Sequence, residues 1–469
     1  MKIALLHQHF LEHPHVCTDT RKINGDCLFF ALKGDNFNGN VYASEALKKG
    51  AVYAVVDAPE YVVSNKYILV DDVLRTLQHL ATFHRNHCNA KVIALTGSNG
   101  KTTTKELINA VLLKKYRSIA TRGNLNNHIG VPLTLLSITQ DTEIAIVEMG
   151  ANHKKEIEFL CDIARPDFGY ITNFGKAHLE GFGSKEGVIQ GKSELYTHLM
   201  ENGKSIFLNA DDPVQLRKLG PHIKKFGFST DKKEYYRIAF VNADPFVTIK
   251  VEGHTINSQL IGSYNFTNCA AAILMGKYFN VPLEDIKHAI EDYSPKNNRS
   301  QILEKNGHRI ILDAYNANPT SMAAALKNFE AMSGRPKIAF LGDMFELGET
   351  AAAEHEIIAD LAAQMAFDEV FLIGEHFHKT EGGPQRKRGG TSQSNADEEF
   401  IPQMGYEAKR SNLDIGKNKG EAFGKNGIKK FDSFERVSEY LKKNPIDTKS
   451  TILIKGSRGM ALERILESL

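Results

Sequence analysis

The amino-acid sequence predicts an α/β protein built from three domains with mainly parallel sheets. The chain has 469 residues, and domains of about 150 residues are the usual way to organise a chain of that length. Short apolar runs typical of buried strands alternate with stretches that repeat apolar residues at the helical period. In residues 91–115 a strand run passes through a glycine turn directly into a helical pattern. This alternation is typical of parallel sheets that carry helices on both faces.

The first predicted domain, residues 1–88, is small and mixes strands with helices. Its strand runs are "DCLFFAL", "AVYAVVD" and "YILVDD", and residues 43–49 have a helix-like pattern. The histidines of the N-terminal stretch "HQHFLEHPH" lack metal-ligand spacing with other ligands, so we expect them at the surface.

The second predicted domain, residues 89–296, has the pattern of a P-loop ATPase-like core. It contains the strand runs "KVIALT", "EIAIVEMG" and "FGYITNFG", each of which stops at a polar turn. The third predicted domain, residues 297–469, repeats the pattern with "RIILDAYNANP", "KIAFLGDM", "EVFLIGE" and "TILIKGSRGM", and with helical stretches at 351–365 and 434–442. A second doubly wound, Rossmann-like sheet is predicted there.

Residues 380–427 interrupt the third predicted domain. The segment is rich in glycine and in charges of both signs, and it has few clustered apolar residues. Such a composition buries too little surface to offset the entropy of ordering, so we expect a flexible insertion. Binding of an anionic partner through "QRKRGG" is an alternative, but the charges of the segment nearly cancel.

Composition indicates an ordinary globular enzyme of the cytoplasm. Lys plus Arg number 58 and Asp plus Glu 56, which gives a net charge of +2 and no electrostatic footprint for nucleic acid. The 5 cysteines are scattered without a C-x-x-C pair, so we expect reduced thiols. The start, "MKIALLHQHF", has no cleavage-site pattern, and no window approaches the roughly 18 apolar residues of a membrane span. We therefore expect no membrane insertion, and we expect a monomer.

The stretch "LTGSNGKTTTK", residues 95–105, resembles a phosphate-binding loop. A strand, a glycine turn and a helix follow one another there, with Lys101 and Thr102 at the helix start. Backbone N–H groups would bind phosphate, the lysine would reach the terminal phosphates, and the hydroxyl would bind Mg²⁺. The common spacing G-x-x-x-x-G-K-[ST] would place glycine where Leu95 stands. Nucleotide binding and a chance strand-to-helix turn are therefore equal alternatives on this stretch alone.

Two side chains at predicted strand ends could complete such a site. Glu148 ends the run "AIVE" and His178 follows the next strand run, so both should lie at the carboxyl edge of the sheet beside the loop. Carboxylate oxygen is the ligand type that Mg²⁺ prefers. A turn-capping role for Glu148 and a structural or exposed role for His178 are the alternatives.

Other candidates have weaker signals in the residues themselves. Composition and spacing do not select Lys192 in "VIQGKSELY", and Asn268 in "IGSYNFTN" would suit helix capping as well as ligand binding. Arg299 and Asp313 lie with the run "YNANP" close to the predicted joint between the second and third domains, where ligand clefts tend to form. An arginine there could stabilise a phosphoryl group and the aspartate could bind a ribose hydroxyl, whereas an interface salt bridge is the alternative.

A series of longer segments indicates a family. In chain order they are "TDTRKINGDCLFFALKGDNFNGN", "TGSNGKTTTK", "RGNLNNHIGVPLTLL", "VEMGANHKKEIEFL", "NFGKAHLEGFGS", "GKSEL", "DAYNANPTSM", "LGDMFELG" and "ILIKGSRGM". Together they resemble the Mur ligases, the ATP-dependent amide-forming enzymes of peptidoglycan precursor synthesis. The last three segments resemble the type that joins D-alanyl-D-alanine to UDP-N-acetylmuramoyl-tripeptide through an acyl phosphate. The resemblance covers nearly the whole chain except residues 380–427.

The resemblance implies a role for each matching residue. The short family loop G-x-x-G-K-[ST] removes the spacing objection and would bind ATP. Its residues are Gly97, Ser98, Asn99, Gly100, Lys101, Thr102 and Thr103. Thr102 would bind a first Mg²⁺, and Glu148, His178 and Lys192 a second. Lys192 matches a lysine that the family carbamylates, which turns an ammonium that would repel Mg²⁺ into an oxygen ligand. Adenine, phosphate and ribose contacts would come from Asn268, Arg299 and Asp313, respectively.

The resemblance also implies which residues bind the substrate, and the sequence departs from the family pattern at two positions. Thr20 stands where serine is common and, with Arg21, would help to hold the UDP moiety. The loop that approaches the muramoyl part matches Asn124, Asn126 and Asn127. Tyr264 stands where relatives often have histidine, so no direct role is assigned to it. Alternatives are another Mur-type or folylpolyglutamate-type ligase, a P-loop kinase or motor ATPase, and a nucleotide-binding regulator with a degenerate site.

Overall fold

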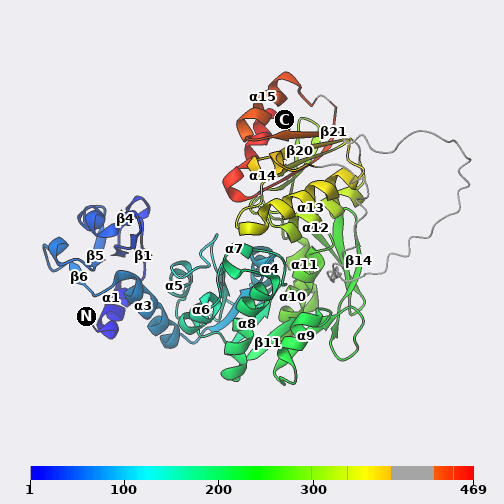
Figure 1. The fold of residues 1–469 in the computed structure, drawn as a ribbon. Coiled ribbons are helices and arrows are strands. Elements are labelled where there is room, and N and C mark those ends of the chain that lie inside the picture. Colours follow the sequence, from blue (N-terminus) through cyan, green and yellow to red (C-terminus); the bar gives the residue numbers. More distant parts are fainter. Residues whose placement is uncertain (1, 297, 335, 382–426, 447) are drawn as a thin grey trace, which may run out of the picture.

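The computed structural model describes residues 2–296, 298–334, 336–381, 427–446 and 448–469. Figure 1 shows three α/β units in sequence order, with the first unit to one side of the central one and the third above it. The predicted fold class of three α/β domains is confirmed, whereas the predicted domain limits stay predictions. The expected insertion at 380–427 lies outside the described residues except at its ends. None of the described helices is long and apolar enough to cross a membrane.

The first unit is a four-stranded parallel sheet with helices on both faces. The strand order is β1 (Val16–Cys17), β2 (Cys27–Phe30), β5 (Ala51–Val56), β6 (Tyr67–Leu69). Alternation along β2 decides which residue meets which helix. Leu28 and Phe30 pack with α1 (Ile3–Glu12) and α3 (Val73–His87), whereas Cys27 and Phe29 pack with α2 (Ala43–Lys48). Both faces are buried, as in other parallel sheets.

The expectation that the N-terminal histidines lie at the surface is wrong for His7. Its side chain is buried between α1 and α3, and its Nε2 lies 3.0 Å from Nδ1 of His84. Burial, together with the neighbouring His84 and His87, lowers the pKa of His7 to about 4. The imidazole therefore packs as a neutral group at neutral pH, and the contact with His84 pairs its buried Nε2.

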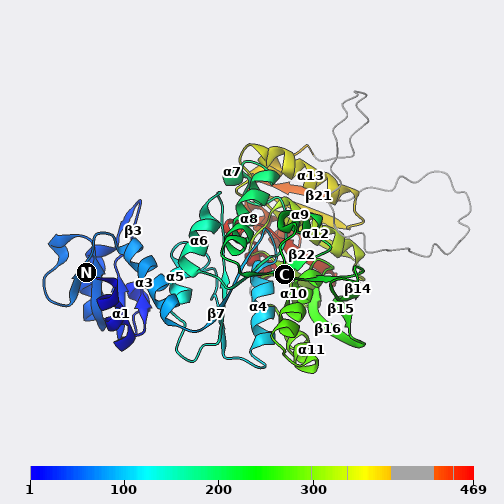
Figure 2. The same ribbon diagram turned by 90° about the horizontal axis from the view of Figure 1, so that it is seen from below.

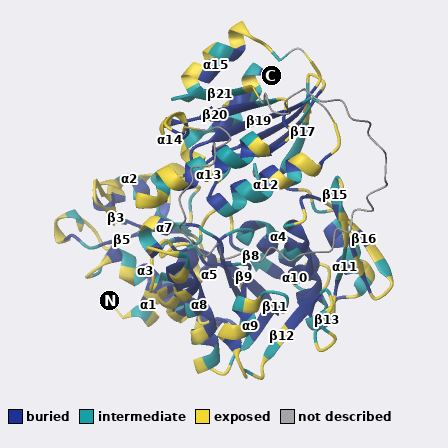
Figure 3. Ribbon diagram, turned by 45° about the vertical axis from the view of Figure 1, so that its right-hand side comes forward, coloured by how far each residue is buried: buried dark blue, intermediate teal, exposed yellow. Residues whose placement is uncertain are grey.

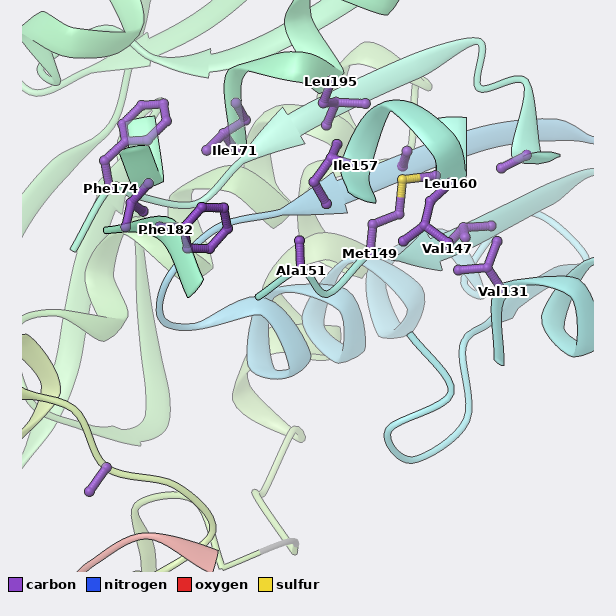
Figure 4. Packing of buried hydrophobic residues seen from close by; sticks show 14 of the residues in the cluster. Val131, Val147, Met149, Ala151, Ile157, Leu160, Ile171, Phe174, Phe182 and Leu195 are labelled. Atoms are coloured by element: carbon purple, nitrogen blue, oxygen red, sulfur yellow. The ribbon is translucent and has the colours of Figure 1, made fainter. Parts of the chain in front are cut away.

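The central unit contains a seven-stranded parallel sheet. Its order is β13 (Tyr236–Arg237), β12 (Lys225–Ser229), β11 (Ser205–Asn209), β10 (Phe168–Ile171), β7 (Lys91–Thr96), β9 (Ile144–Glu148), β8 (Ser118–Ala120). In β7, Ile93 and Leu95 face α4 (Lys101–Leu112) and α10 (Asn265–Tyr278). Val92 and Ala94 face the layer of α6 (Glu156–Ala164) and α8 (Lys185–Glu201). Figure 4 shows the packing on that second face, where Met149, Ile157 and Leu160 lie together.

An antiparallel sheet beside the central sheet was not predicted. It consists of β14 (Ala239–Ala243), β15 (Phe246–Val251) and β16 (His254–Ile261), and it packs on α10 and on α11 (Leu283–Glu291). Alternate residues of these strands, such as Val247 and Ile249, belong to the core under α4 and α10. The sheet therefore extends the hydrophobic cover of α10.

The third unit has a six-stranded sheet, in which only the first strand is antiparallel to its neighbour. The order is β17 (Gln301–Lys305), β18 (His308–Asp313), β22 (Thr451–Lys455), β19 (Lys337–Gly342), β20 (Glu369–Ile373), β21 (Gly427–Phe431). One face is covered by α12 (Pro319–Ala331) and α13 (Ala351–Gln364), and the other by α15 (Phe434–Lys443). Figure 3 shows the strands of both large sheets as the most deeply buried elements.

Asp167 ties α3 of the first unit to the central sheet. Its carboxylate lies 2.7 Å from Arg85 Nη2 and 2.9 Å from Lys204 Nζ, and it accepts a hydrogen bond from the Val92 amide at 3.1 Å. Burial alone would raise the pKa of Asp167, but the contacts with Lys204, Val92 and Arg85 outweigh burial and lower it. Its stabilising effect is therefore present above the pKa of an unfolded aspartate, about 4, and is lost as the pH falls below that value.

We expect Asp167→Ala to lower the free energy of unfolding at pH 7 by about 3 kcal/mol, because it leaves a largely buried arginine without its partner. Urea titrations of the variant and of Asp162→Ala, whose carboxylate is exposed, would measure this. The difference between the two should shrink below about pH 4. Equal stability of the two variants at pH 7 would contradict the role of the ion pair.

Candidate active site

The phosphate loop lies between the end of β7 at Thr96 and the start of α4 at Lys101. Gly97 has φ 145° and Gly100 has φ 79°, conformations that L side chains rarely adopt. Space excludes a side chain as well. A Cβ atom at Gly97 would lie 1.9 Å from Thr172 Oγ1, and one at Gly100 would lie 2.6 Å from Asn268 Oδ1. The two glycines of the short loop are therefore required by the backbone and by the close approach of neighbouring segments.

We expect Gly97→Ala to lower stability by about 2 kcal/mol, through backbone strain and the clash with Thr172, and to weaken ATP binding. Thermal unfolding and calorimetric ATP titration would measure the two effects. Gly253→Ala is the matched control, because Gly253 also has a positive φ, 84°, but has open space around its Cβ position. A loss of ATP affinity that is the same in both variants would contradict this reading.

Neighbouring strand ends hold the loop in place. Ser98 Oγ donates to Gly175 O at 2.9 Å, and the Asn99 amide donates to Asn173 Oδ1 at 3.0 Å. Lys101 folds back over the loop, with Nζ 2.7 Å from Gly97 O. Burial is the largest influence on the pKa of Lys101 and lowers it, while the charge of Glu148 opposes this effect. Thr103, the last residue of the predicted loop, is partly buried on α4.

Thr102 and Glu148 meet as the sequence predicts. Leu95 of β7 pairs with Glu148 of β9 in the parallel register, which places the carboxylate beside the first turn of α4. Thr102 Oγ1 lies 3.1 Å from Glu148 Oε2, and Asn126 Nδ2 donates to Glu148 Oε1 at 2.9 Å. All three oxygens are hard ligands of the kind that Mg²⁺ prefers. The described residues contain no group of three or more His, Cys, Asp or Glu that could hold a metal by themselves.

His178 lies at the start of α7 (Leu179–Phe182) in the left-handed conformation, with φ 54°. Its Nδ1 is 2.5 Å from Oε2 of Glu346 in the third unit, although the orientation of the two groups is not that of a regular hydrogen bond. The contact with His178 is the main cause that lowers the pKa of Glu346, and Lys101 adds to it. The sequence did not predict Glu346 as a partner, although it lies in the quoted segment "LGDMFELG".

Lys192 has the least exposed side chain among the ionisable residues of the site. It lies on α8 with 0% exposure, and its Nζ donates to Ala151 O at 2.9 Å and lies 5.0 Å from the centre of the Phe182 ring. Burial, followed by the charge of Lys101, lowers its pKa well below the ordinary lysine value. A fully buried lysine without a carboxylate at hydrogen-bond distance is unusual, so a solvent-facing role for Lys192 is excluded.

The residues expected at the adenine side come close to the loop. Asn268 on α10 accepts a hydrogen bond from Thr104 Oγ1 at 3.0 Å and donates to Asn265 Oδ1 at 2.7 Å. Tyr264 is partly buried, and its hydroxyl lies 2.9 Å from Ser300 Oγ in the next unit. Burial and the charge of Asp313 raise the pKa of the Tyr264 hydroxyl, so the phenol stays neutral and acts as a hydrogen-bonding group.

Some residues of the third unit lie beside the candidate nucleotide site. The Arg299 guanidinium lies 3.7 Å from the centre of the Tyr315 ring, and its Nε has no hydrogen-bond partner among the described residues. Asp313 pairs with Lys455 Nζ at 2.6 Å instead of with Arg299, and it accepts from the Ser300 amide at 3.1 Å. Asn318, from the run "YNANP", donates to Asn99 Oδ1 at 2.7 Å. The third unit therefore touches the phosphate loop directly.

The residues expected on the substrate side are not gathered into one cluster. Arg21 forms a pair with Asp19 at 2.8 Å and is largely exposed, and Thr20 starts the same short helix. Asn127 accepts from the Gly130 amide at 2.9 Å at the start of α5 (Gly130–Leu135), and Asn124 is exposed. Of the three asparagines expected near the muramoyl part, Asn126 is the one whose side chain contacts Glu148 of the candidate metal site.

A phosphate loop between a parallel strand and a helix, beside a carboxylate on the neighbouring strand end, defines the class of P-loop nucleotide-binding proteins. Three family models match along the chain: "Mur ligase family, catalytic domain" at residues 14–85, "Mur ligase middle domain" at 95–276, and "Mur ligase, glutamate ligase domain" at 298–405. The chain belongs to the Mur ligase family.

Individual relatives agree with the family. The chain is 38% identical to the UDP-N-acetylmuramoyl-tripeptide--D-alanyl-D-alanine ligase of Bacillus subtilis over 77% of this chain and 80% of the relative. It is 34% identical to the enzyme of the same name from Escherichia coli over 77% of this chain and 82% of the relative. A crystal structure of MurF from Acinetobacter baumannii superposes with a TM-score of 0.78 at 26% identity, covering 97% of this chain and 93% of that chain.

Proposed function

We propose that this chain is an ATP-dependent ligase that joins D-alanyl-D-alanine to UDP-N-acetylmuramoyl-tripeptide. The observation that carries the proposal is the similarity to enzymes of this name over 77% of this chain, combined with an intact phosphate loop that the third unit touches through Asn318. The product is a peptidoglycan precursor, so loss of the enzyme would affect cell shape and division. ATP and a nucleotide-linked peptide are its substrates, which supports residence in the cytoplasm.

The reaction divides into two balanced steps. First, a carboxylate oxygen of the tripeptide attacks the γ-phosphorus of ATP, the bond to the bridging oxygen breaks, and ADP leaves. The D-alanyl-D-alanine amine then attacks the acyl carbon, loses a proton, and phosphate leaves with the former carboxylate oxygen. Lys101 and Arg299 are the cations that neutralise charge on the transferring group. Because an acyl phosphate hydrolyses readily, contact between the third unit and the loop serves to exclude water.

The donor set fits Mg²⁺ bound with the nucleotide. The Thr102 hydroxyl would hold it next to the Glu148 carboxylate, together with phosphate oxygens and water. The ion would supply charge neutralisation on the phosphates. A second Mg²⁺ would be held by Glu148, His178 and an anionic form of Lys192, in addition to oxygen ligands from the substrates.

The surroundings of Lys192 support carbamylation. The amine is fully buried and its pKa is well below the ordinary lysine value, mainly because of burial, which favours the neutral, nucleophilic form. Its nitrogen can bond to the carbon of CO₂ with loss of one proton, which yields an anionic carbamate. The negative oxygen would then replace a cation that Lys101 repels.

The finer assignments remain proposals with separate tests. Thr20 and Arg21 would contact the UDP moiety, Asn124, Asn126 and Asn127 the muramoyl side, and Asn268, Arg299 and Asp313 the nucleotide. The domain limits 1–88, 89–296 and 297–469 and the monomeric state belong to the same proposal. Weaker binding of uridine diphosphate to Arg21→Ala, measured by calorimetry, would support the first of these roles, and unchanged binding would overturn it.

One assay tests the proposed function. Purified protein is mixed with ATP, Mg²⁺, UDP-N-acetylmuramoyl-tripeptide and D-alanyl-D-alanine, and each component is omitted in turn. We expect phosphate release and the joined peptide, measured by mass spectrometry, only when all are present. Phosphate release that does not depend on the dipeptide would instead indicate a kinase or an ATPase.

A further inference from the structure

A short segment of the third unit clasps α7 of the central unit. The clasp consists of residues 346–348 on one side and 178–180 on the other. The Glu180 amide donates to Glu346 O at 3.1 Å, and the Cβ position of Gly348 is 3.2 Å from Glu180 Cα. Figures 1 and 2 both show α7 at the boundary between the central unit and α13. Backbone and packing contacts therefore fix the segment against α7.

The clasp brings the Glu346 carboxylate next to the His178 imidazole. Glu346 Oε2 lies 2.5 Å from His178 Nδ1, and Glu346 is close enough to Lys101 for the two charges to influence each other. Glu346 and His178 both have positive φ, 61° and 54°. Such backbone conformations are strained in a non-glycine residue, and they persist only where surrounding contacts enforce them.

An imidazole whose Nδ1 lies this close to a carboxylate has little freedom to turn, and it presents Nε2 on its other side. We propose that Glu346 is a positioning residue, which orients His178 for the ligase centre and does so only when the third unit is docked on the central unit. This inference rests on the proposed function, because it assigns Glu346 to that reaction. It follows that domain docking and completion of the centre are one event.

A merely structural ion pair is the competing explanation, and a partly exposed pair of that kind contributes little to stability. The chain offers a matched control. Lys176 Nζ pairs with Glu354 Oε1 at 3.0 Å and also joins the central and third units, but Glu354 has no contact with His178 among those described. Loss of the Glu354 carboxylate therefore removes an inter-unit ion pair and leaves the orientation of His178 unchanged.

The test compares Glu346→Gln, Glu346→Asp, Glu354→Gln and the exposed Glu349→Gln, with melting temperatures to verify folding. We expect Glu346→Gln to lower kcat about 10- to 30-fold, as for other groups that orient a ligand, with KM for ATP within about threefold. Glu346→Asp should recover part of the loss, and Glu354→Gln should lose much less. Glu346→Gln should have no further effect in a His178→Ala background, because it acts through His178.

A second experiment, hydrogen exchange, does not depend on catalytic turnover. Hydrogen exchange of the protein without substrates should be faster at residues 179–182 in Glu346→Gln than in wild type and in Glu349→Gln. The inference is overturned if the kcat of Glu346→Gln stays within twofold of wild type, if Glu354→Gln loses as much, or if exchange at α7 does not change. Absence of dipeptide-dependent turnover in wild type would refute the proposed function instead, and the exchange experiment would still decide whether Glu346 holds the clasp.

Discussion

Lys101→Ala should reduce kcat/KM by about 10³-fold, the size of effect seen when a charge that stabilises a transferring phosphoryl group is removed. The side chain starts α4 and already bonds to the loop carbonyl of Gly97 at 2.7 Å, so it is placed where the phosphates would lie. Steady-state phosphate release with all substrates would measure the loss. Folding should be retained, because the substitution removes a charge that burial disfavours.

The matched control for Lys101→Ala is Lys114→Ala, since Lys114 is exposed just beyond the end of α4. That variant should keep wild-type turnover. If Lys101→Ala retained more than a tenth of the wild-type kcat/KM, the phosphate loop would not be the nucleotide site, and the assignment of Thr102 and Glu148 to bound Mg²⁺ would lose its basis.

If Lys192 carries the proposed carbamate, Lys192→Ala should lower turnover by about 10²- to 10³-fold, because it would remove an oxygen ligand and with it part of the several kcal/mol that a metal ion contributes to charge stabilisation. High bicarbonate together with a short-chain carboxylic acid should restore part of the activity. The acid would occupy the space that the side chain leaves and would supply the missing negative oxygen.

Mass spectrometry of the intact wild-type protein and of Lys192→Ala, prepared with ¹³C-bicarbonate and trapped chemically, would detect the carbamate directly. Lys154→Ala, an exposed lysine of the central unit, is the control for unspecific labelling. Full activity of Lys192→Ala without any additive would contradict the carbamate role, as would rescue that is equally strong with a neutral amide in place of the acid.

The sequence alone was sufficient to predict those parts of the site that come from neighbouring strands of a single sheet. Glu148 was expected beside Thr102 because parallel strands end at the same edge, and the observed register of Leu95 with Glu148 brings the two side chains within 3.1 Å. Composition and spacing did not select Lys192, and its burial was not predicted. Burial depends on the packing of Phe182 and Ala151 around the amine, which no local pattern encodes.

Local sequence patterns could not predict the contacts between units. Asn318 of the third unit reaches Asn99 of the phosphate loop across 219 positions of the chain. The partner of His178 could not be predicted, because Glu346 reaches it only through the docking of two separately folded sheets. For such contacts, the family resemblance supplied expected roles but not the partners that the structure shows.

Transfer of ¹⁸O tests the central claim most directly. UDP-N-acetylmuramoyl-tripeptide labelled with ¹⁸O in both oxygens of its terminal carboxylate is converted with ATP and D-alanyl-D-alanine, and the released phosphate is analysed by mass spectrometry. An acyl-phosphate route places one ¹⁸O in each phosphate and leaves the other in the new amide. Formation of the joined peptide with unlabelled phosphate would contradict the account.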